Sequence, residues 1–133
     1  MEHTPQLWHK FYETLGFLFY SLSFADGSVK KQEVETVKKL LRDDWLGVES
    51  SLDEYGYDAA YQLEAVFDWL CETQPSAASA FKRFRSFVID HPMFIDQKLK
   101  EKILDSANQI ISSYAQKNKA ELGYLYQLQE SLR

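Results

Sequence analysis

The sequence predicts an all-α protein, a single compact bundle of about six helices that occupies residues 1–133 as one domain. Apolar residues recur at steps of three and four along most of the chain, which is the spacing of one face of an α-helix. No stretch alternates between apolar and polar residues for long enough to predict a strand. Proline and glycine stand where the apolar pattern breaks, so they separate the predicted helices.

The first helix is predicted from Thr4-Pro5 to about Phe24. Threonine is a good N-cap, and proline suits the first helical position because its missing N–H would have no helical partner there. The apolar residues of this helix form one stripe: Trp8, Phe11, Tyr12, Leu15, Phe19 and Leu22. A second helix ends at Gly47 and has its own stripe: Val34, Val37, Leu41 and Trp45. Residues 47–57 are predicted as a loop.

Proline separates the third helix from the fourth. The third follows Asp58, which is predicted as its N-cap, and stops at Gln74-Pro75. The fourth follows Ser76 and ends before His91-Pro92, because the residue preceding a proline disfavours helix. The inward residues are Leu63, Val66, Phe67 and Leu70 in the third helix and Phe81, Phe84 and Val88 in the fourth.

A fifth helix is predicted from about Asp96 to Gln116, and Asn118 caps a sixth. Glu121, three residues after Asn118, completes the pattern of a capping box. The inward residues are Leu99, Ile103, Ala107, Ile110 and Tyr114 in the fifth helix and Leu122, Leu125, Leu128 and Leu132 in the sixth. Tyr124 and Tyr126 add apolar surface to the sixth helix, which either docks on its own bundle or also faces a partner.

Composition restricts the compartment and the partners. The formal net charge is −5, which opposes general attraction to nucleic acid or anionic lipid. Cys71 is the only cysteine, and a chain without an internal disulfide is typical of a reducing compartment. The first residues lack a secretory signal pattern, and no apolar run approaches the ~20 residues that span a bilayer. We therefore expect a cytoplasmic protein with no transmembrane segment.

The corner between the first two helices reads Ala25-Asp26-Gly27-Ser28-Val29, with Glu33 four residues further on. Two interpretations remain open. In the first, Asp26 caps the second helix and Glu33 interacts with its positive end, so the corner is structural. In the second, Asp26 and Glu33 are ligands of a weakly bound divalent cation such as calcium. An EF-hand is not expected, because Leu22 and Phe24 would occupy the positions of two of its oxygen ligands.

The same corner, Phe24–Val29 with Glu33, resembles the tellurite-resistance TerB-like family, which has Ala-Asp-Gly-x-Val-x-x-x-Glu between its first helices. The closing segment Lys117–Leu128 is also similar to the end of such domains. The resemblance implies a helical bundle of two weakly related halves about a pseudo-twofold axis. It also implies a link to stress and to membrane-associated complexes, and metal binding by acids at the corners. Of those acids, Asp26 and Glu33 match the family pattern.

The corresponding corner of the second half is expected at Asp90–Asp96, and it contains no Asp-Gly pair. If Ile95 is aligned with Val29, Leu99 occupies the position of Glu33. The second half therefore supplies fewer acids than the resemblance implies.

The segment Phe81–Arg85 alternates aromatic and basic residues, a pattern that can indicate nucleic-acid binding. At helical spacing its two phenylalanines belong to the core, while Lys82 and Arg83 face solvent. Arg85 is expected nearer the buried side, paired with an acid such as Asp26 or Glu33. We therefore expect a protein partner and no nucleic acid, and nothing in the pattern indicates an oligomeric state.

No catalytic or cofactor-binding residues are predicted, and we do not expect an enzyme. The sequence contains no Gly-x-Ser-x-Gly elbow, no phosphate-binding glycine loop and no His-Glu-x-x-His pair. The expected function is a protein-interaction or stress-associated module resembling TerB-like proteins. The alternative is a metal-binding or metal-sensing domain that uses Asp26 and Glu33.

Overall fold

The structure is a computed structural model that describes residues 5–25, 31–45, 60–112 and 119–132; of residues 5, 31–33, 60 and 119–122 it describes the backbone alone. The described residues form six helices and no strand, which confirms the predicted all-α bundle. The helices are α1 (Pro5–Ser23), α2 (Lys31–Trp45), α3 (Ala60–Thr73), α4 (Ala77–Asp90), α5 (Gln97–Ser112) and α6 (Lys119–Ser131). The predicted N-caps Thr4, Asp58 and Asn118, and the predicted continuation of the fifth helix to Gln116, lie outside the described residues.

Prolines and capping side chains set the boundaries of the central helices. After α3 ends, Gln74 has a left-handed backbone with φ of 51°, and Pro75 follows it. The Ser76 side chain accepts a hydrogen bond from the Ser79 N–H at 3.1 Å, so Ser76 is the N-cap of α4. At the start of α5, Asp96 Oδ1 accepts the N–H of Leu99 at 2.9 Å in the same way.

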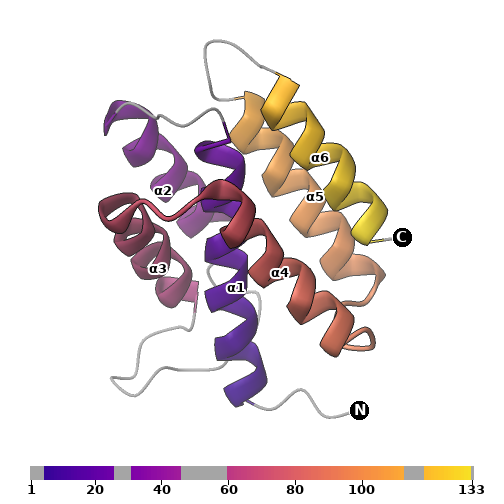
Figure 1. The fold of residues 1–133 in the computed structure, drawn as a ribbon. Coiled ribbons are helices and arrows are strands. Elements are labelled where there is room, and N and C mark those ends of the chain that lie inside the picture. Colours follow the sequence, from indigo (N-terminus) through magenta and orange to yellow (C-terminus); the bar gives the residue numbers. More distant parts are fainter. Residues whose placement is uncertain (1–4, 26–30, 46–59, 113–118, 133) are drawn as a thin grey trace.

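Helix α1 runs through the middle of the bundle (Figure 1). It packs against α3, α4, α5 and α6, while α2 packs against α3 and α5. Every residue from Phe11 to Phe24 except Glu13 is buried. The prediction of one apolar stripe was therefore wrong for this helix. A helix that is apolar all round belongs in the core, and Phe17-Leu18-Phe19-Tyr20 carries that signal.

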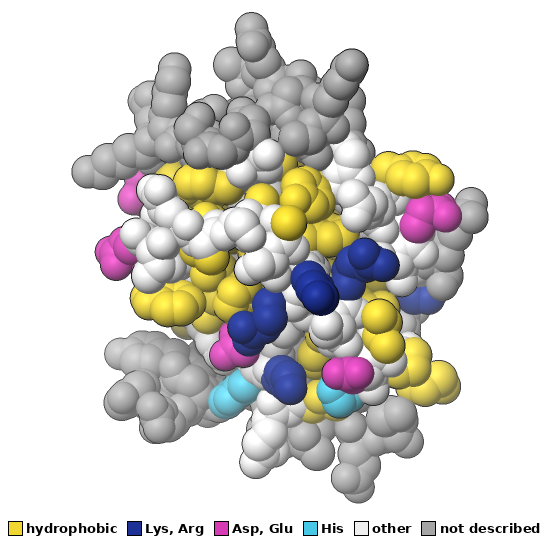
Figure 2. Space-filling view, viewed as in Figure 1, with side chains coloured by type: hydrophobic (Ala, Val, Ile, Leu, Met, Phe, Trp, Pro, Cys, Tyr) yellow, Lys and Arg dark blue, Asp and Glu magenta, His cyan; other side chains and the backbone are white. Residues whose placement is uncertain are grey.

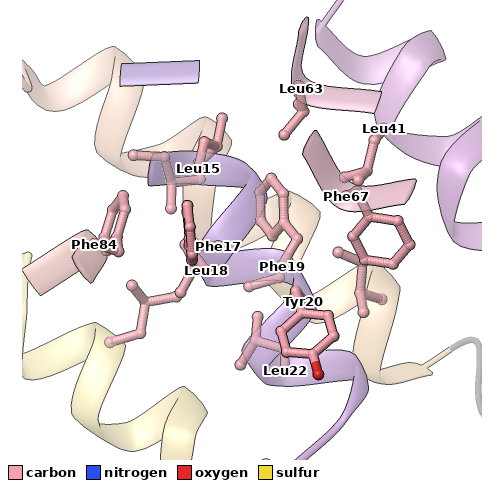
Figure 3. Close-up of a cluster of buried hydrophobic side chains, with 14 of the residues drawn as sticks. Leu15, Phe17, Leu18, Phe19, Tyr20, Leu22, Leu41, Leu63, Phe67 and Phe84 are labelled. Carbon is pink, nitrogen blue, oxygen red and sulfur yellow. The ribbon is translucent and has the colours of Figure 1, made fainter. Parts of the chain in front are cut away.

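Figure 3 shows how α1 shares its side chains between two sides of the bundle. Leu41, Leu63 and Phe67 lie on one side of α1, and Phe84 lies on the other. All four residues are fully buried and belong to one core cluster that contains residues of all six helices.

Aromatic rings fill the part of the core where α1, α2 and α4 meet the turn before α5. Phe11 is central, with ring centroids 5.2 Å from Phe94, 5.8 Å from Phe87 and 6.0 Å from Trp45. Phe87 was not among the predicted inward residues of the fourth helix. It is buried, whereas the predicted Val88 is half-buried, because α1 and the turn before α5 both cover the side of α4 that carries Phe87.

Trp45 at the end of α2 also ties that helix to α5. Its Nε1–H donates to Ser106 Oγ at 3.0 Å, and the Ser106 hydroxyl donates to Asp44 Oδ2, also at 3.0 Å. Gln109 Nε2 donates to the same carboxylate oxygen at 3.2 Å. The buried indole N–H is therefore satisfied through a side-chain network that ends on a half-buried carboxylate.

Cys71 near the end of α3 packs against the core, as expected, and is half-buried. Burial raises the pKa of its thiol to about 12, so the thiol stays protonated at neutral pH. None of the described helices is both long and apolar enough to cross a membrane.

Candidate functional site

The predicted metal ligands fall where the structure describes little. Asp26 lies outside the described residues, and Glu33 lies in the first turn of α2, where the backbone alone is described. Within the described parts of the chain, no three His, Cys, Asp or Glu side chains gather closely enough to hold a metal ion. The cation site at the first corner therefore stays a prediction.

The second corner, between α4 and α5, is described and is held by apolar packing. Phe94 and Ile95 are buried in the core, and Asp96 caps α5. Leu99, which aligns with Glu33, is also buried. The structure therefore gives this corner a packing role through Phe94 and Ile95 and a capping role through Asp96.

A groove between α4 and α6 forms a surface site in the described part of the chain. On α4, Phe81, Phe84 and Phe87 face the core, so positions 78, 82, 85 and 89 fall on an outer face, one helical turn apart. On α6, Leu128 is buried and Leu125 is half-buried. Tyr124 and Gln127 consequently lie on the side of α6 that faces the groove.

These side chains enclose a cavity of about 490 Å³ that opens to solvent. Its lining residues are Ala78, Phe81, Lys82, Arg85, Ser86 and Ile89 from α4, and Tyr124 and Gln127 from α6. The rings of Phe81 and Tyr124 are in contact, with centroids 5.0 Å apart, and join the two helices at the apolar floor. Ile89 is 72% exposed, although it is a large apolar side chain.

A smaller cavity of about 220 Å³ continues the groove along α6. Arg85 and Gln127 line both cavities, and Tyr126, Glu130 and Ser131 complete the smaller one. Tyr126 is 63% exposed, which confirms that part of the sixth helix presents aromatic surface. Leu132 is instead buried, so the predicted docking of this helix on its own bundle is confirmed as well.

The cations of the groove differ from Lys38, Arg42 and Arg83, which have acidic partners. Between α2 and α3, Lys38 pairs with Asp68 at 3.0 Å, and Arg42 holds Glu64 through two hydrogen bonds. The pairing with Arg42 lowers the pKa of the Glu64 carboxyl.

Arg83 also has partners. Its Cζ lies 4.5 Å from the centroid of the Phe17 ring, and its Nη2 lies 3.6 Å from Glu13 Oε1. Lys82 and Arg85 are exposed and make no ion pair with any acid that the structure describes. Figure 2 shows Lys and Arg side chains gathered across the middle of the face that α4 crosses in Figure 1, among apolar side chains.

The expected position of Arg85 near the buried side was therefore wrong. Arg85 is exposed on α4 and lines both cavities next to α6, because Phe84 and Phe87 occupy the inward face on either side of it. Lys82 and Arg83 face solvent and the flanking phenylalanines are buried, as predicted. From the sequence, Lys82 was grouped with Arg83 and Arg85 was set apart, although the spacing of Lys82, Arg85 and Ile89 places these three residues on one side of α4.

Comparison with protein-family models, with curated proteins and with solved structures finds no match to this chain. The resemblance to TerB-like proteins therefore stays a prediction from two short segments.

Proposed function

We propose that this protein is a non-enzymatic protein-interaction module and that the groove between α4 and α6 is its binding surface. The observation that carries the proposal is the combination in one open groove of an exposed Ile89, a floor of Phe81 and Tyr124, and two cations, Lys82 and Arg85, without an acidic partner in the described chain. Exposed aromatic and aliphatic side chains beside arginine are typical of residues that dominate protein interfaces.

The same features are hard to explain as requirements of the fold. Burying a side chain of the size of isoleucine contributes about 1.5–3 kcal/mol, and the bundle leaves Ile89 mostly in water. Lys82 and Arg85 lie outside the core cluster, so the stability of the bundle does not depend on their identity. A partner that covers the groove would bury the isoleucine and pair the cations.

Site-specific photocrosslinking in cells of the source organism tests this proposal. We expect a crosslinker amino acid at position 89 to capture a defined protein, and the same crosslinker at Trp69 to capture none of it. Trp69 is a matched control because it is 56% exposed on α3, away from the groove. Addition of the substitutions K82E and R85E should abolish the crosslink at position 89. Equal capture at positions 89 and 69 would contradict the proposal. So would a crosslink at position 89 that K82E and R85E leave unchanged.

The resemblance to TerB-like proteins supports a role in a stress-associated complex, and it also carries a second proposal, a divalent cation bound by Asp26 and Glu33. That second proposal rests on the sequence of the corner, because Asp26 and Glu33 supply carboxylate oxygens, which are the ligands that calcium prefers. Titration with terbium, read by its sensitised luminescence, should give a saturable signal that Asp26→Ala removes. A signal that Asp26→Ala leaves unchanged would contradict the proposed cation site and would not affect the proposal for the groove.

A further inference from the structure

We infer that the groove between α4 and α6 binds an acidic, amphipathic helix of a partner protein. The inference rests on the proposed function and names the chemistry of the segment that occupies the groove. It follows from three properties of the groove: its length and walls, its apolar floor, and its two cations, which pair with no acid among the described residues.

The length and the walls of the groove favour a helix as the occupant. The lining residues of α4 extend from Ala78 to Ile89, which is about 16 Å at the rise of an α-helix, or about three turns. Both walls are α-helices, whose backbone groups bond within each helix and offer no edge to an extended strand. An occupant must therefore satisfy its own backbone hydrogen bonds, and a helix laid into the groove does so.

The apolar floor selects an amphipathic sequence. Phe81 and Tyr124 meet at the base of the groove, and Ile89 stands exposed towards one end of it. A helix that presents apolar residues at steps of three and four can bury these side chains along a single face. Apolar contact alone would accept many helices, so the specificity must come from the charges.

The charges select acids on the partner. Lys82 and Arg85 lie three residues apart on α4, so both ammonium and guanidinium groups face the same side of the helix. The chain as a whole carries a net charge of −5, so this pair attracts acids locally against the overall field. Glutamates that flank the apolar face of a partner helix would pair with both cations. A basic helix would be repelled by them.

Fluorescence anisotropy with designed peptides and the full chain tests this inference. The probe is a labelled 15-residue helical peptide with leucines at steps of three and four and glutamates at the flanking positions. Two matched peptides carry lysine or glutamine in place of the glutamates. We expect the acidic peptide to bind at least about tenfold more tightly than the lysine peptide, and its affinity to fall as salt is raised.

Charge-reversal variants provide the matched controls. The double variant K82E/R85E should weaken binding of the acidic peptide at least about tenfold and should bind the lysine peptide better than the parent chain does. That gain is assigned to the groove if it exceeds the gain of a variant that has the same net charge with its substitutions elsewhere. The variant K39E/K98E makes the same change in net charge at two exposed lysines of α2 and α5, and it should bind the acidic peptide as the parent does.

Three outcomes would overturn the inference. One is equal affinity for the acidic and lysine peptides, and another is an equal loss of affinity in K39E/K98E. The third is concentration-dependent dimerisation of the chain that K82E/R85E abolishes, because a second copy would then occupy the groove. If no acidic peptide binds but the crosslink at position 89 persists, the inference fails and the groove binds a segment that is not an acidic helix. If the crosslink is also absent, the proposed function fails as well.

Discussion

Replacing Trp45 with alanine is expected to lower the free energy of unfolding by about 3–5 kcal/mol. The indole is fully buried, with ring centroids 6.0 Å from Phe11 and 6.4 Å from Tyr12. Truncation removes these contacts, opens a cavity where α1 and α2 meet, and takes the N–H donor away from Ser106. Urea denaturation followed by far-ultraviolet circular dichroism measures the loss.

Trp45→Phe is the matched control for the same position. Phenylalanine keeps a ring in the core but cannot donate to Ser106, so we expect a smaller loss of about 1–2 kcal/mol. Its Ser106 hydroxyl would still donate to Asp44, which limits the cost. If the alanine and phenylalanine variants lose the same free energy of unfolding, packing of the Trp45 ring is not the main source of the stabilisation.

Gly16→Val is expected to destabilise the protein by about 3 kcal/mol, because α1 and α3 approach closely at this glycine. A Cβ atom at position 16 would lie 2.8 Å from Val66 Cγ1 and 3.1 Å from Val66 Cβ. Val66 cannot turn away easily, since a β-branched side chain in a helix has one strongly preferred rotamer. The two helices must therefore separate or the core must rearrange, and urea denaturation measures the cost.

Two comparisons separate crowding from helix propensity. Gly123→Ala is the control, because no atom lies within 4 Å of the added Cβ, and alanine in a helix should stabilise the protein by up to about 1 kcal/mol. Gly16→Ala should lack this gain, and the second substitution Val66→Ala should restore it. If a double-mutant cycle gives no coupling free energy between Gly16→Ala and Val66→Ala, the close approach of position 16 to Val66 does not explain the cost of a side chain there.

The helices themselves were predictable because their signals are local. Pro5 opens α1, Pro75 follows the end of α3, and Pro92 follows the end of α4, each through the steric limits of the proline ring. The apolar spacing of Leu63, Phe67 and Leu70 in α3 depends on 3.6 residues per turn and on nothing outside the helix. Such features need no knowledge of the neighbouring elements.

The groove was less predictable, although the sequence contains every residue that lines it. Arg85 was expected nearer the buried side, but the side of α4 that carries it is left open beside α6. Periodicity shows that a face is apolar or charged, and it does not show which helix covers that face. The corner residues Asp26 and Glu33 had the clearest local pattern, and their cation site stays a prediction.

The amino-acid order alone was enough to establish the class of fold, the ends of α3 and α4 next to proline, and most of the described inward positions. Propensity, capping and the period of the helix act within a few residues. The central place of α1, the contact of Gly16 with Val66, the network from Trp45 to Asp44 and the position of Lys82 and Arg85 beside α6 depend on how helices distant in the chain pack together. Those arrangements arise from the joint burial of several apolar faces at once, and no single segment carries that information.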